Sequence, residues 1–330
     1  MRAASAPVSS PAKAFRGSIL LLAFAFVPMV LAGEAPVPAA AAAAPAPAQK
    51  AVLVTGASTG IGHKITERLA AAGYFVYAGA RKEADLKALG ALKNVQALRL
   101  DVTQQQDIEA AVASIRQGGR GLYGLVNNAG IATIGGLADT DPKEFDLLMQ
   151  VNLYGPYRVS RAMLPLLTES HGRITNIGSI SGILASPRLM AYTMSKHAME
   201  AFTDSLAAQL KDSGVTVNVV EPGNYNSEIG RNAIARSGAD LKTMPASVAR
   251  LIDRSVYKEP DEVAAAVEQA LFAGQPQRRY LVVPNQEEAE QTIRQQLRQL
   301  AQLNGAQPYS YSRDALVKML DEALAEAHTN

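Results

Sequence analysis

Cysteine is absent from this chain of 330 residues, and histidine is scarce. Without cysteine there can be no disulfide framework, no thiolate metal site and no catalytic thiol. The four histidines, at positions 63, 171, 197 and 328, do not have the spacing of metal ligands, so no metal site is predicted. The chemistry of the protein must therefore rest on other side chains.

Most of the chain also lacks an excess of charge of either sign. The formal net charge is +2, but Arg2, Lys13 and Arg16 are the only charged residues before residue 33. Without these three, 29 basic residues face 30 acidic ones. A nearly neutral body gives no electrostatic reason to expect nucleic-acid binding. Hydrophobic residues make up 48% of the chain, which is enough for a large core and excludes a disordered protein.

The N-terminus has the features of a targeting segment. The three positive charges precede an apolar run from Ile19 to Ala32 that only Pro28 interrupts. This run is shorter than the ~20 residues that cross a bilayer as a helix. We therefore predict that residues 1–32 are a secretory signal peptide and that the protein is exported, periplasmic or secreted. The alternative is a retained membrane anchor, with membrane contact through residues 17–32. Residues 33–49, mostly Ala and Pro, predict a semi-extended linker.

Apolar runs alternate with helical patterns from Lys50 onward. Strands are expected at 51–55, 74–78, 95–100, 122–126, 174–177, 215–220 and 280–283, and helices near 64–72, 103–117, 142–169 and 191–212. This alternation predicts an α/β fold with a doubly wound parallel sheet that helices cover on both faces. Apolar residues recur at helical spacing over 286–330, which predicts a helical extension. The extension would pack on the core, form a subunit interface or wall the substrate pocket.

A glycine-rich turn follows the first expected strand directly. The turn runs from Thr55 to Gly62 and spaces its glycines as G-x3-G-x-G. Glycines at this point let the backbone approach a diphosphate, and the following helix presents unpaired N–H groups to it. The turn therefore predicts a dinucleotide site, and the alternative is a glycine turn needed only for packing.

The end of the second strand indicates which dinucleotide is preferred. An acidic residue usually binds the ribose 2′-hydroxyl of NAD there. This chain instead has Ala80, Arg81 and Lys82, with no acid before Glu83. An arginine suits a 2′-phosphate because its planar fork matches phosphate oxygens. We therefore expect NADP(H) to be favoured over NAD(H). Alternatively the two cations are solvated loop charges, and Glu83 reaches the ribose and favours NAD.

A tyrosine and a lysine four residues apart form the candidate catalytic pair. Tyr192 and Lys196 would share one face of a helix. A nearby ammonium favours the phenolate form, which suits the phenol to proton transfer. Such a tyrosine can protonate a carbonyl oxygen or, in reverse, deprotonate an alcohol.

These motifs together resemble the short-chain dehydrogenase/reductase family. They are the TGxxxGxG turn at Thr55–Gly62, Asp101-Val102, Asn127-Asn128-Ala129-Gly130, Asn152, Ser179, Tyr192, Lys196 and Pro222-Gly223, all in the family's order. The resemblance covers about 50–285 and implies a single-domain Rossmann fold with about seven parallel strands. It also implies an NAD(P)-dependent oxidoreductase for an alcohol/carbonyl pair. The alternative is a non-catalytic nucleotide-binding protein with a sensing or scaffolding role, which the complete catalytic set disfavours.

The resemblance also assigns roles to individual residues. It implies that Tyr192 is the acid/base, that Lys196 supports it and holds the nicotinamide ribose, that Ser179 orients the substrate, and that Asn152 kinks a helix and supports a water relay. Ser181 is a rival to Ser179 but has the wrong spacing. The implied cofactor-binding residues are Gly56, Ser58, Thr59, Gly60, Ile61, Gly62, Arg81, Asp101, Val102, Asn128, Ala129, Gly130, Tyr192, Lys196, Pro222, Gly223 and Ser227. Ser227 stands where the family often has Thr.

The segment that should choose the substrate is rich in apolar residues. In the family, residues 224–258 correspond to the substrate lid, and here this segment contains Ile229, Ile234, Leu241, Met244, Val248, Leu251 and Ile252. We therefore expect a small lipophilic alcohol or ketone as the substrate. A homo-oligomer, either a dimer or a tetramer, is also expected.

The targeting segment generates the first testable prediction. We expect protein made in its native host to start near Gly33, because residues 1–32 form a signal peptide. Intact-mass analysis of the purified protein measures this. A full-length mass in a membrane fraction would instead indicate the anchor, and a full-length mass in the cytosol would contradict both alternatives.

Overall fold

The computed structural model describes residues 49–237 and 254–329. The expected targeting segment, nearly all of the Ala/Pro linker, and the lid residues Leu241 to Ile252 lie outside these ranges. Within the two ranges, no helix combines the length and the apolar character needed to cross a membrane.

Seven parallel strands form the predicted sheet. They are β1 (Ala51–Val54), β2 (Phe75–Ala80), β3 (Val95–Arg99), β4 (Gly124–Asn127), β5 (Arg173–Ile177), β6 (Thr216–Pro222) and β7 (Arg279–Val282). Their order in the sheet is β3-β2-β1-β4-β5-β6-β7, and every neighbouring pair is parallel. The chain thus starts at the centre of the sheet, builds outward through β3, and returns to the centre at β4. This is the Rossmann-like topology that the sequence predicted, with a crevice where the strand order reverses.

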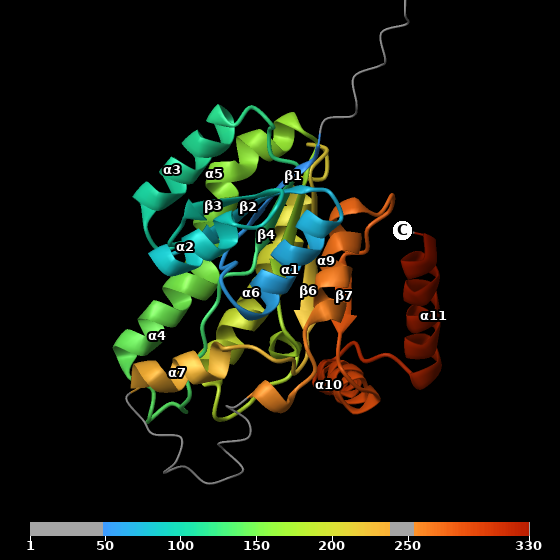
Figure 1. Ribbon diagram of the computed structural model, residues 1–330. Coiled ribbons are helices and arrows are strands. Elements are labelled where there is room, and N and C mark those ends of the chain that lie inside the picture. The colour runs from blue at the N-terminus through green and yellow to red at the C-terminus, as the bar shows by residue number, and fades with distance from the viewer. Residues whose placement is uncertain (1–48, 238–253, 330) are drawn as a thin grey trace, which may run out of the picture. The chain divides into compact units, whose positions relative to one another are not determined.

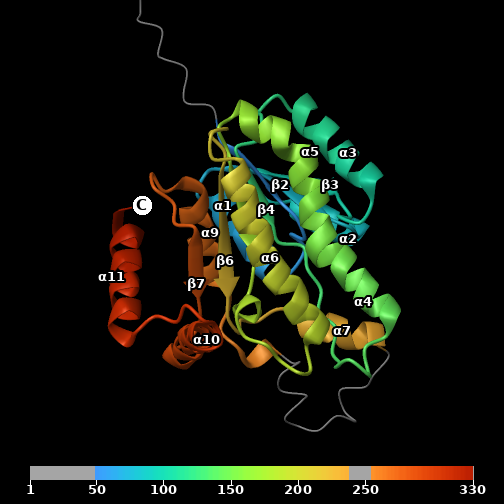
Figure 2. The ribbon, with the colours of Figure 1, turned by 180° about the vertical axis from the view of Figure 1, so that it is seen from behind.

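Helices cover both faces of the sheet, as Figures 1 and 2 show from opposite sides. One face carries α1 (Gly60–Ala71), α2 (Glu83–Gly90) and α9 (Asp261–Phe272), and the other carries α3 (Gln105–Gln117), α5 (Gly155–Glu169) and α6 (Met190–Gln209). The apolar run of β1 explains this arrangement, since Leu53 packs into one core and Val52 and Val54 into the other. A strand buried on both faces needs such a continuous apolar run.

The helix expected over 142–169 is divided. It consists of α4 (Pro142–Met149), a π-helical turn at Gln150–Tyr154, and α5. In the turn, the Asn152 side chain leaves the helix surface to bond the backbone of Ile131. A Cβ at Gly155 would lie 2.7 Å from the Val102 side chain, so any larger residue at the start of α5 would clash with Val102. The turn coincides with the asparagine to which the resemblance assigns a helix kink.

Two helices lie beyond the β7 edge of the sheet (Figure 1). They are α10 (Gln286–Gly305) and α11 (Arg313–Thr329), so the extension is helical as expected. Their large apolar residues are about half exposed, among them Ile293, Leu297, Leu320 and Leu324. These side chains therefore do not join the core of the subunit. The sequence did not indicate α2 or α7 (Ile229–Ser237), which are short and flank the site.

Three carboxylates meet one arginine where α6 packs against β6 and β7. Arg279 Nη2 lies 2.7 Å from Asp204, and its Nε lies 3.4 Å from Glu200 and 3.6 Å from Glu221. Glu221 is almost fully buried. Burial first, and then the charge of Glu200, raises the pKa of the Glu221 carboxyl to about 8. Burial likewise raises the pKa of Glu200. One guanidinium therefore does not compensate all of these acids.

This cluster predicts how stability depends on pH. Because the pKa of Glu221 is higher in the folded chain than its ordinary value of 4.5, the folded state binds its proton more tightly. The contribution of Glu221 to the free energy of unfolding should therefore be fully present below about pH 4.5 and be lost as the pH rises through about 8. We expect Glu221→Gln to flatten this decrease, measured by denaturant unfolding between pH 5 and 8. Glu109→Gln, an exposed control on α3, should keep the wild-type profile; a Glu221→Gln profile parallel to wild type would contradict the assignment.

Candidate active site

The glycine-rich turn forms a cradle between β1 and α1. Gly56 and Gly60 have φ of +65° and +55°, values that L side chains rarely adopt. A Cβ at Gly62 would lie 2.3 Å from both the Gly56 carbonyl oxygen and Asn128 Nδ2. Thr59 makes no side-chain cap on α1, and the first turn of that helix contains no acid. Its backbone N–H groups and positive dipole end are therefore available to an anion.

The residues after β4 hold this cradle in place. Asn128 Nδ2 donates to the carbonyl oxygens of Thr55 and Gly56, at 2.9 and 3.0 Å. Thr55 Oγ1 accepts from the backbone N–H groups of Asn128 and Ala129. Asn127 is buried and donates to Ser160 on α5 and to Asn176 on β5. The four-residue motif thus connects the glycine turn to the centre of the sheet.

The ends of β2 and β3 form the part of the site where the sequence predicts the ribose 2′-phosphate. Asp101 Oδ1 accepts from the backbone N–H and the hydroxyl of Thr103, which fixes its carboxylate in a turn. Arg81 Nη1 lies 3.7 Å from Asp101 Oδ2, and its side chain is 62% exposed. Arg81 and Lys82 line the cavity described below, as does Asp85. Glu83, the alternative ribose ligand, is not among the described residues that line it.

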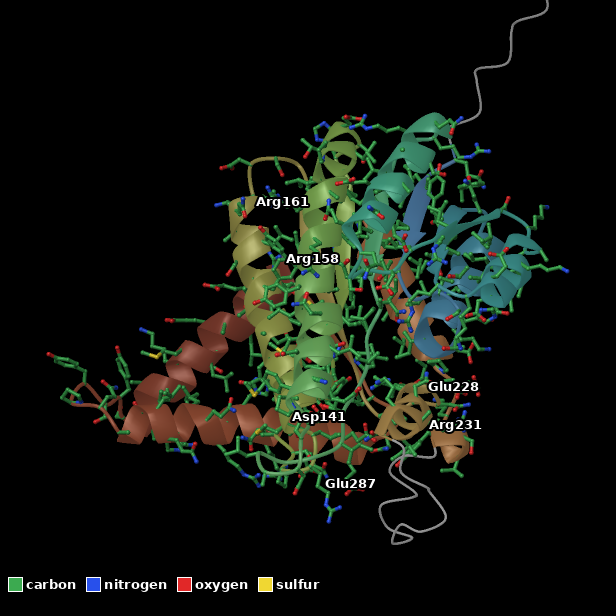
Figure 3. The ribbon with its side chains drawn as sticks, turned by 90° about the vertical axis from the view of Figure 1, so that its left-hand side faces the viewer. Asp141, Arg158, Arg161, Glu228, Arg231 and Glu287 are labelled. Carbon is green, nitrogen blue, oxygen red and sulfur yellow. The ribbon has the colours of Figure 1, made fainter. Side chains whose placement is uncertain are left out.

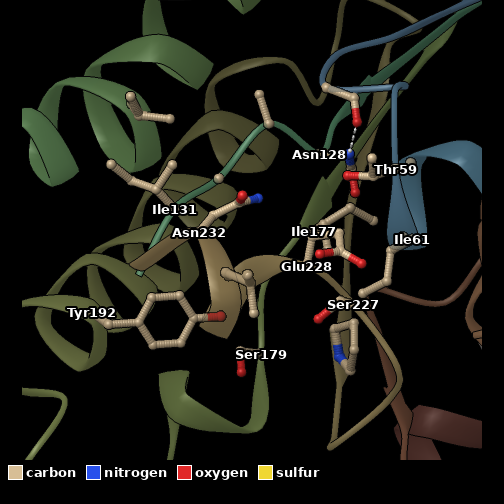
Figure 4. Close-up of a pocket in the computed structure, with 18 of the residues that line it drawn as sticks. Thr59, Ile61, Asn128, Ile131, Ile177, Ser179, Tyr192, Ser227, Glu228 and Asn232 are labelled. Carbon is tan, nitrogen blue, oxygen red and sulfur yellow. Dashed lines mark hydrogen bonds between the residues drawn. The ribbon is translucent and has the colours of Figure 1, made fainter. Parts of the chain in front are cut away.

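The candidate catalytic groups gather around the start of α6. Lys196 is buried, and its Nζ donates to the Ile177 carbonyl oxygen at 2.7 Å. The same Nζ lies 5.6 Å from the centre of the Tyr192 ring. Ser179 caps a short 3-10 turn at Ile180–Gly182, and its Oγ accepts from the Ser181 N–H. Figure 4 shows the Tyr192 and Ser179 side chains bordering one space, with Thr59, Ile61 and Asn128 across it.

The Asn152 side chain connects the loop after β4 to the start of α6. Its Nδ2 donates to the Ile131 carbonyl oxygen and to Ser195 Oγ, and its Oδ1 accepts from the Ile131 N–H. Ser195 Oγ in turn donates to the Tyr192 carbonyl oxygen. The π-helical turn, the loop after β4 and the first turns of α6 are therefore joined by one side chain. Asn152 is 1% exposed, so each of these bonds forms in a buried environment where it is costly to lose.

One cavity of about 890 Å³ unites the predicted residues at the carboxyl ends of the strands. Every predicted cofactor-binding residue lines it, from Gly56 in the glycine turn to Pro222, Gly223 and Ser227 after β6. Ser179, Tyr192 and Lys196 also line the cavity, whereas Asn152 is not among its lining residues. Ser181, the rival serine, also borders the cavity. The glycine cradle and the uncapped helix end fit the diphosphate of a nicotinamide dinucleotide.

Several cavity residues escaped the sequence analysis. Asn224 follows the nicotinamide motif, and Glu228, Asn232 and Arg236 follow it at intervals of four. Asn232 and Arg236 lie four residues apart on α7, so they share one face of that helix, whereas Asn224 and Glu228 precede it. Arg236 is already engaged, since it donates to the Ala132 carbonyl oxygen and to Glu144 on α4. The lid therefore presents polar as well as apolar groups to the cavity.

A family model for short chain dehydrogenases matches residues 50–237. The chain belongs to the short-chain dehydrogenase/reductase family. This family comprises NAD(P)-dependent oxidoreductases that act on CH–OH and C=O groups. The family assignment explains the order of the motifs and the sheet topology together.

Relatives within the family have different substrates. A mitochondrial D-β-hydroxybutyrate dehydrogenase of Mus musculus is 38% identical over 186 residues, which are 53% of this chain and 54% of that protein. The chain thus matches about half of that dehydrogenase. An NADPH-dependent 3-dehydrocapnine reductase of Ornithobacterium rhinotracheale is 32% identical over 248 residues, 70% of this chain and 87% of that one. A short-chain dehydrogenase structure from Streptomyces avermitilis superposes with a TM-score of 0.66 at 28% identity, covering 78% of this chain and 96% of that chain.

Proposed function

We propose that this protein is an NADP(H)-dependent oxidoreductase that interconverts an alcohol and a carbonyl on a lipophilic small molecule. One observation carries the proposal. Tyr192, Lys196 and Ser179 border the same cavity as the glycine cradle, so a proton-transfer group and a dinucleotide site share one cavity. A nucleotide-binding protein without catalysis would not need a buried lysine beside the tyrosine ring.

The chemistry divides between the cofactor and the chain. When bound, the nicotinamide supplies or accepts a hydride. The Tyr192 hydroxyl gives a proton to the carbonyl oxygen in reduction and takes one from the alcohol in oxidation. The Lys196 ammonium stabilises the phenolate that results from proton donation. Ser179 Oγ accepts from the Ser181 N–H, a bond that does not use the Ser179 hydroxyl proton, so this proton can be donated to the substrate oxygen.

The proposed preference for NADP(H) rests on the end of β2. Arg81 and Lys82 border the cavity, and Asp101 holds the Arg81 guanidinium at its rim. A planar guanidinium binds a phosphate through two parallel hydrogen bonds. The related 3-dehydrocapnine reductase is named as NADPH-dependent, which supports the same choice.

The proposed lipophilic substrate rests on apolar residues of the cavity. Ile131, Leu184, Leu189 and Ile229 are among the residues that line the same cavity as Tyr192. Apolar walls with a few placed polar groups are the usual form of a small-molecule site. The relatives compared above act on D-β-hydroxybutyrate and 3-dehydrocapnine, so their names alone do not select one substrate.

The catalytic proposal is tested by Tyr192→Phe. The substitution keeps the ring but removes the acid/base hydroxyl, so turnover of NADPH with a reactive ketone should decrease ~10²–10⁴-fold. Nucleotide affinity, measured by titration, should stay near the wild-type value. Tyr309→Phe removes a hydroxyl from an exposed residue in the α10–α11 loop and should have no effect. Turnover of Tyr192→Phe within twofold of wild type would falsify the assignment.

The cofactor proposal is tested by Arg81→Ala. Charged hydrogen bonds are worth ~1.5–3 kcal/mol, and the exposure of Arg81 favours the lower part of that range. We expect about tenfold weaker NADPH binding and unchanged NADH binding, measured by titrating both cofactors. Arg116→Ala, which removes an exposed arginine on α3, is the matched control. A wild-type protein that binds NADH more tightly than NADPH would contradict the preference.

A further inference from the structure

The loop that leaves β6 for the active site is held by the C-terminal extension. Asn224 donates twice to Glu288, from its backbone N–H to Oε2 at 2.9 Å and from its side-chain Nδ2 to Oε1 at 3.0 Å. Glu288 is the third residue of α10, 64 positions further along the chain. One carboxylate therefore satisfies two donors of a residue that lines the cavity.

Glu288 is itself held firmly. Asn285 caps α10, and its Oδ1 accepts from the Glu288 N–H at 2.9 Å. One turn later, the buried Thr292 donates from its hydroxyl to the Glu288 carbonyl oxygen at 2.7 Å. A carboxylate in the first turn of a helix is also favoured by the helix dipole. The backbone of Glu288 is thus fixed independently of the bonds that its carboxylate accepts from Asn224.

The neighbouring glycine is adapted to this contact. A Cβ at Gly223 would lie 2.2 Å from Glu288 Oε2 and 3.0 Å from Pro284. Gly223 N–H also donates to the Val282 carbonyl oxygen at the end of β7. Glycine at this position therefore lets Glu288 of α10 approach the loop closely, which any side chain at position 223 would prevent.

The other side of the loop is fixed as well. The buried Tyr225 donates from its hydroxyl to Glu262 on α9 at 2.7 Å. Pro222, Gly223, Asn224 and Ser227 all line the cavity on the side that the resemblance assigns to the nicotinamide. Loss of Glu288 would leave the Asn224 donors without these bonds and free this wall to shift.

We propose that Glu288 is a positioning residue that fixes the Gly223–Asn224 wall against the nicotinamide end of the cofactor. The C-terminal extension is then part of the active site through this one carboxylate. The proposal rests on the proposed function only in that the cavity binds a nicotinamide dinucleotide. The ligand concerned is a nicotinamide dinucleotide, and Glu288 should affect the binding of its nicotinamide end only.

Binding measurements with a whole and a shortened ligand test the proposal. NADPH spans the cavity, whereas 2′-phospho-ADP-ribose has the same adenine end and no nicotinamide. We expect Glu288→Ala to weaken NADPH binding about tenfold and to leave 2′-phospho-ADP-ribose binding within twofold. Glu288→Gln retains an acceptor and should lie between Ala and wild type. Glu287→Ala removes the adjacent exposed acid, labelled in Figure 3, and should match wild type for both ligands.

The outcomes separate this proposal from the enzymatic one. Equal loss of affinity for both ligands, or no loss for NADPH, would overturn the role of Glu288. If Glu288→Ala does not fold, Asn224→Ala, which removes the side-chain donor alone, should show the same selective loss on a smaller scale. A wild-type protein that binds NADPH but reduces no carbonyl defeats the proposed function, while the titration still decides the role of Glu288. If the wild-type protein prefers NADH, then NADH and ADP-ribose replace the two ligands in this titration. If the wild-type protein binds neither NADPH nor NADH, both proposals are wrong.

Discussion

The bonds that Asn128 makes to the backbone of Thr55 and Gly56 are the constraint on which the rest of the site depends. They join the ends of β1 and β4, the two central strands between which the strand order reverses. The close approach of Gly62 to the same amide excludes any side chain at that glycine. The phosphate cradle and the centre of the sheet are therefore one unit. A change on either side would move the other.

The catalytic groups are also attached to the sheet by side-chain bonds to the backbone. Asn152 donates to the carbonyl oxygen of Ile131, which follows β4. Lys196 donates to the carbonyl oxygen of Ile177 at the end of β5. Both side chains are almost fully buried, so an unmade bond would cost about 1–3 kcal/mol. The Tyr192 ring is thereby placed relative to the sheet and not only relative to its own helix. Rigid elements hold the reacting groups, which is what precise proton transfer requires.

Local patterns in the sequence predicted most of the fold. Continuous apolar runs such as that of β1 are typical of strands buried on both faces, and the glycine spacing between β1 and α1 is specific because only glycine fits the turn. The Tyr192 and Lys196 pair also depends only on helical spacing. These features were predictable because each depends on interactions between residues that are close together in the sequence.

Contacts between distant segments were not predictable in this way. Glu288 and Asn224 are far apart along the chain, and nothing near either residue indicates the other. The same holds for Glu200, Glu221 and Arg279, which three separate elements bring together. The π-helical turn required knowledge of where Asn152 finds its partners. Export of the protein and the identity of its substrate stay predictions, since the first lies outside the described residues and the second depends on the lid.

The order in which the chain is synthesised gives the position of α10 a further meaning. The glycine cradle, Asn152, Ser179 and the Tyr192–Lys196 pair all precede β6, whereas Val282 and Glu288, which hold the wall after β6, come later. A nascent chain that has emerged only through β6 lacks the groups that hold this wall, and it also lacks α9, which supplies part of the core. The wall after β6 can therefore be fixed only after Glu288 has been synthesised.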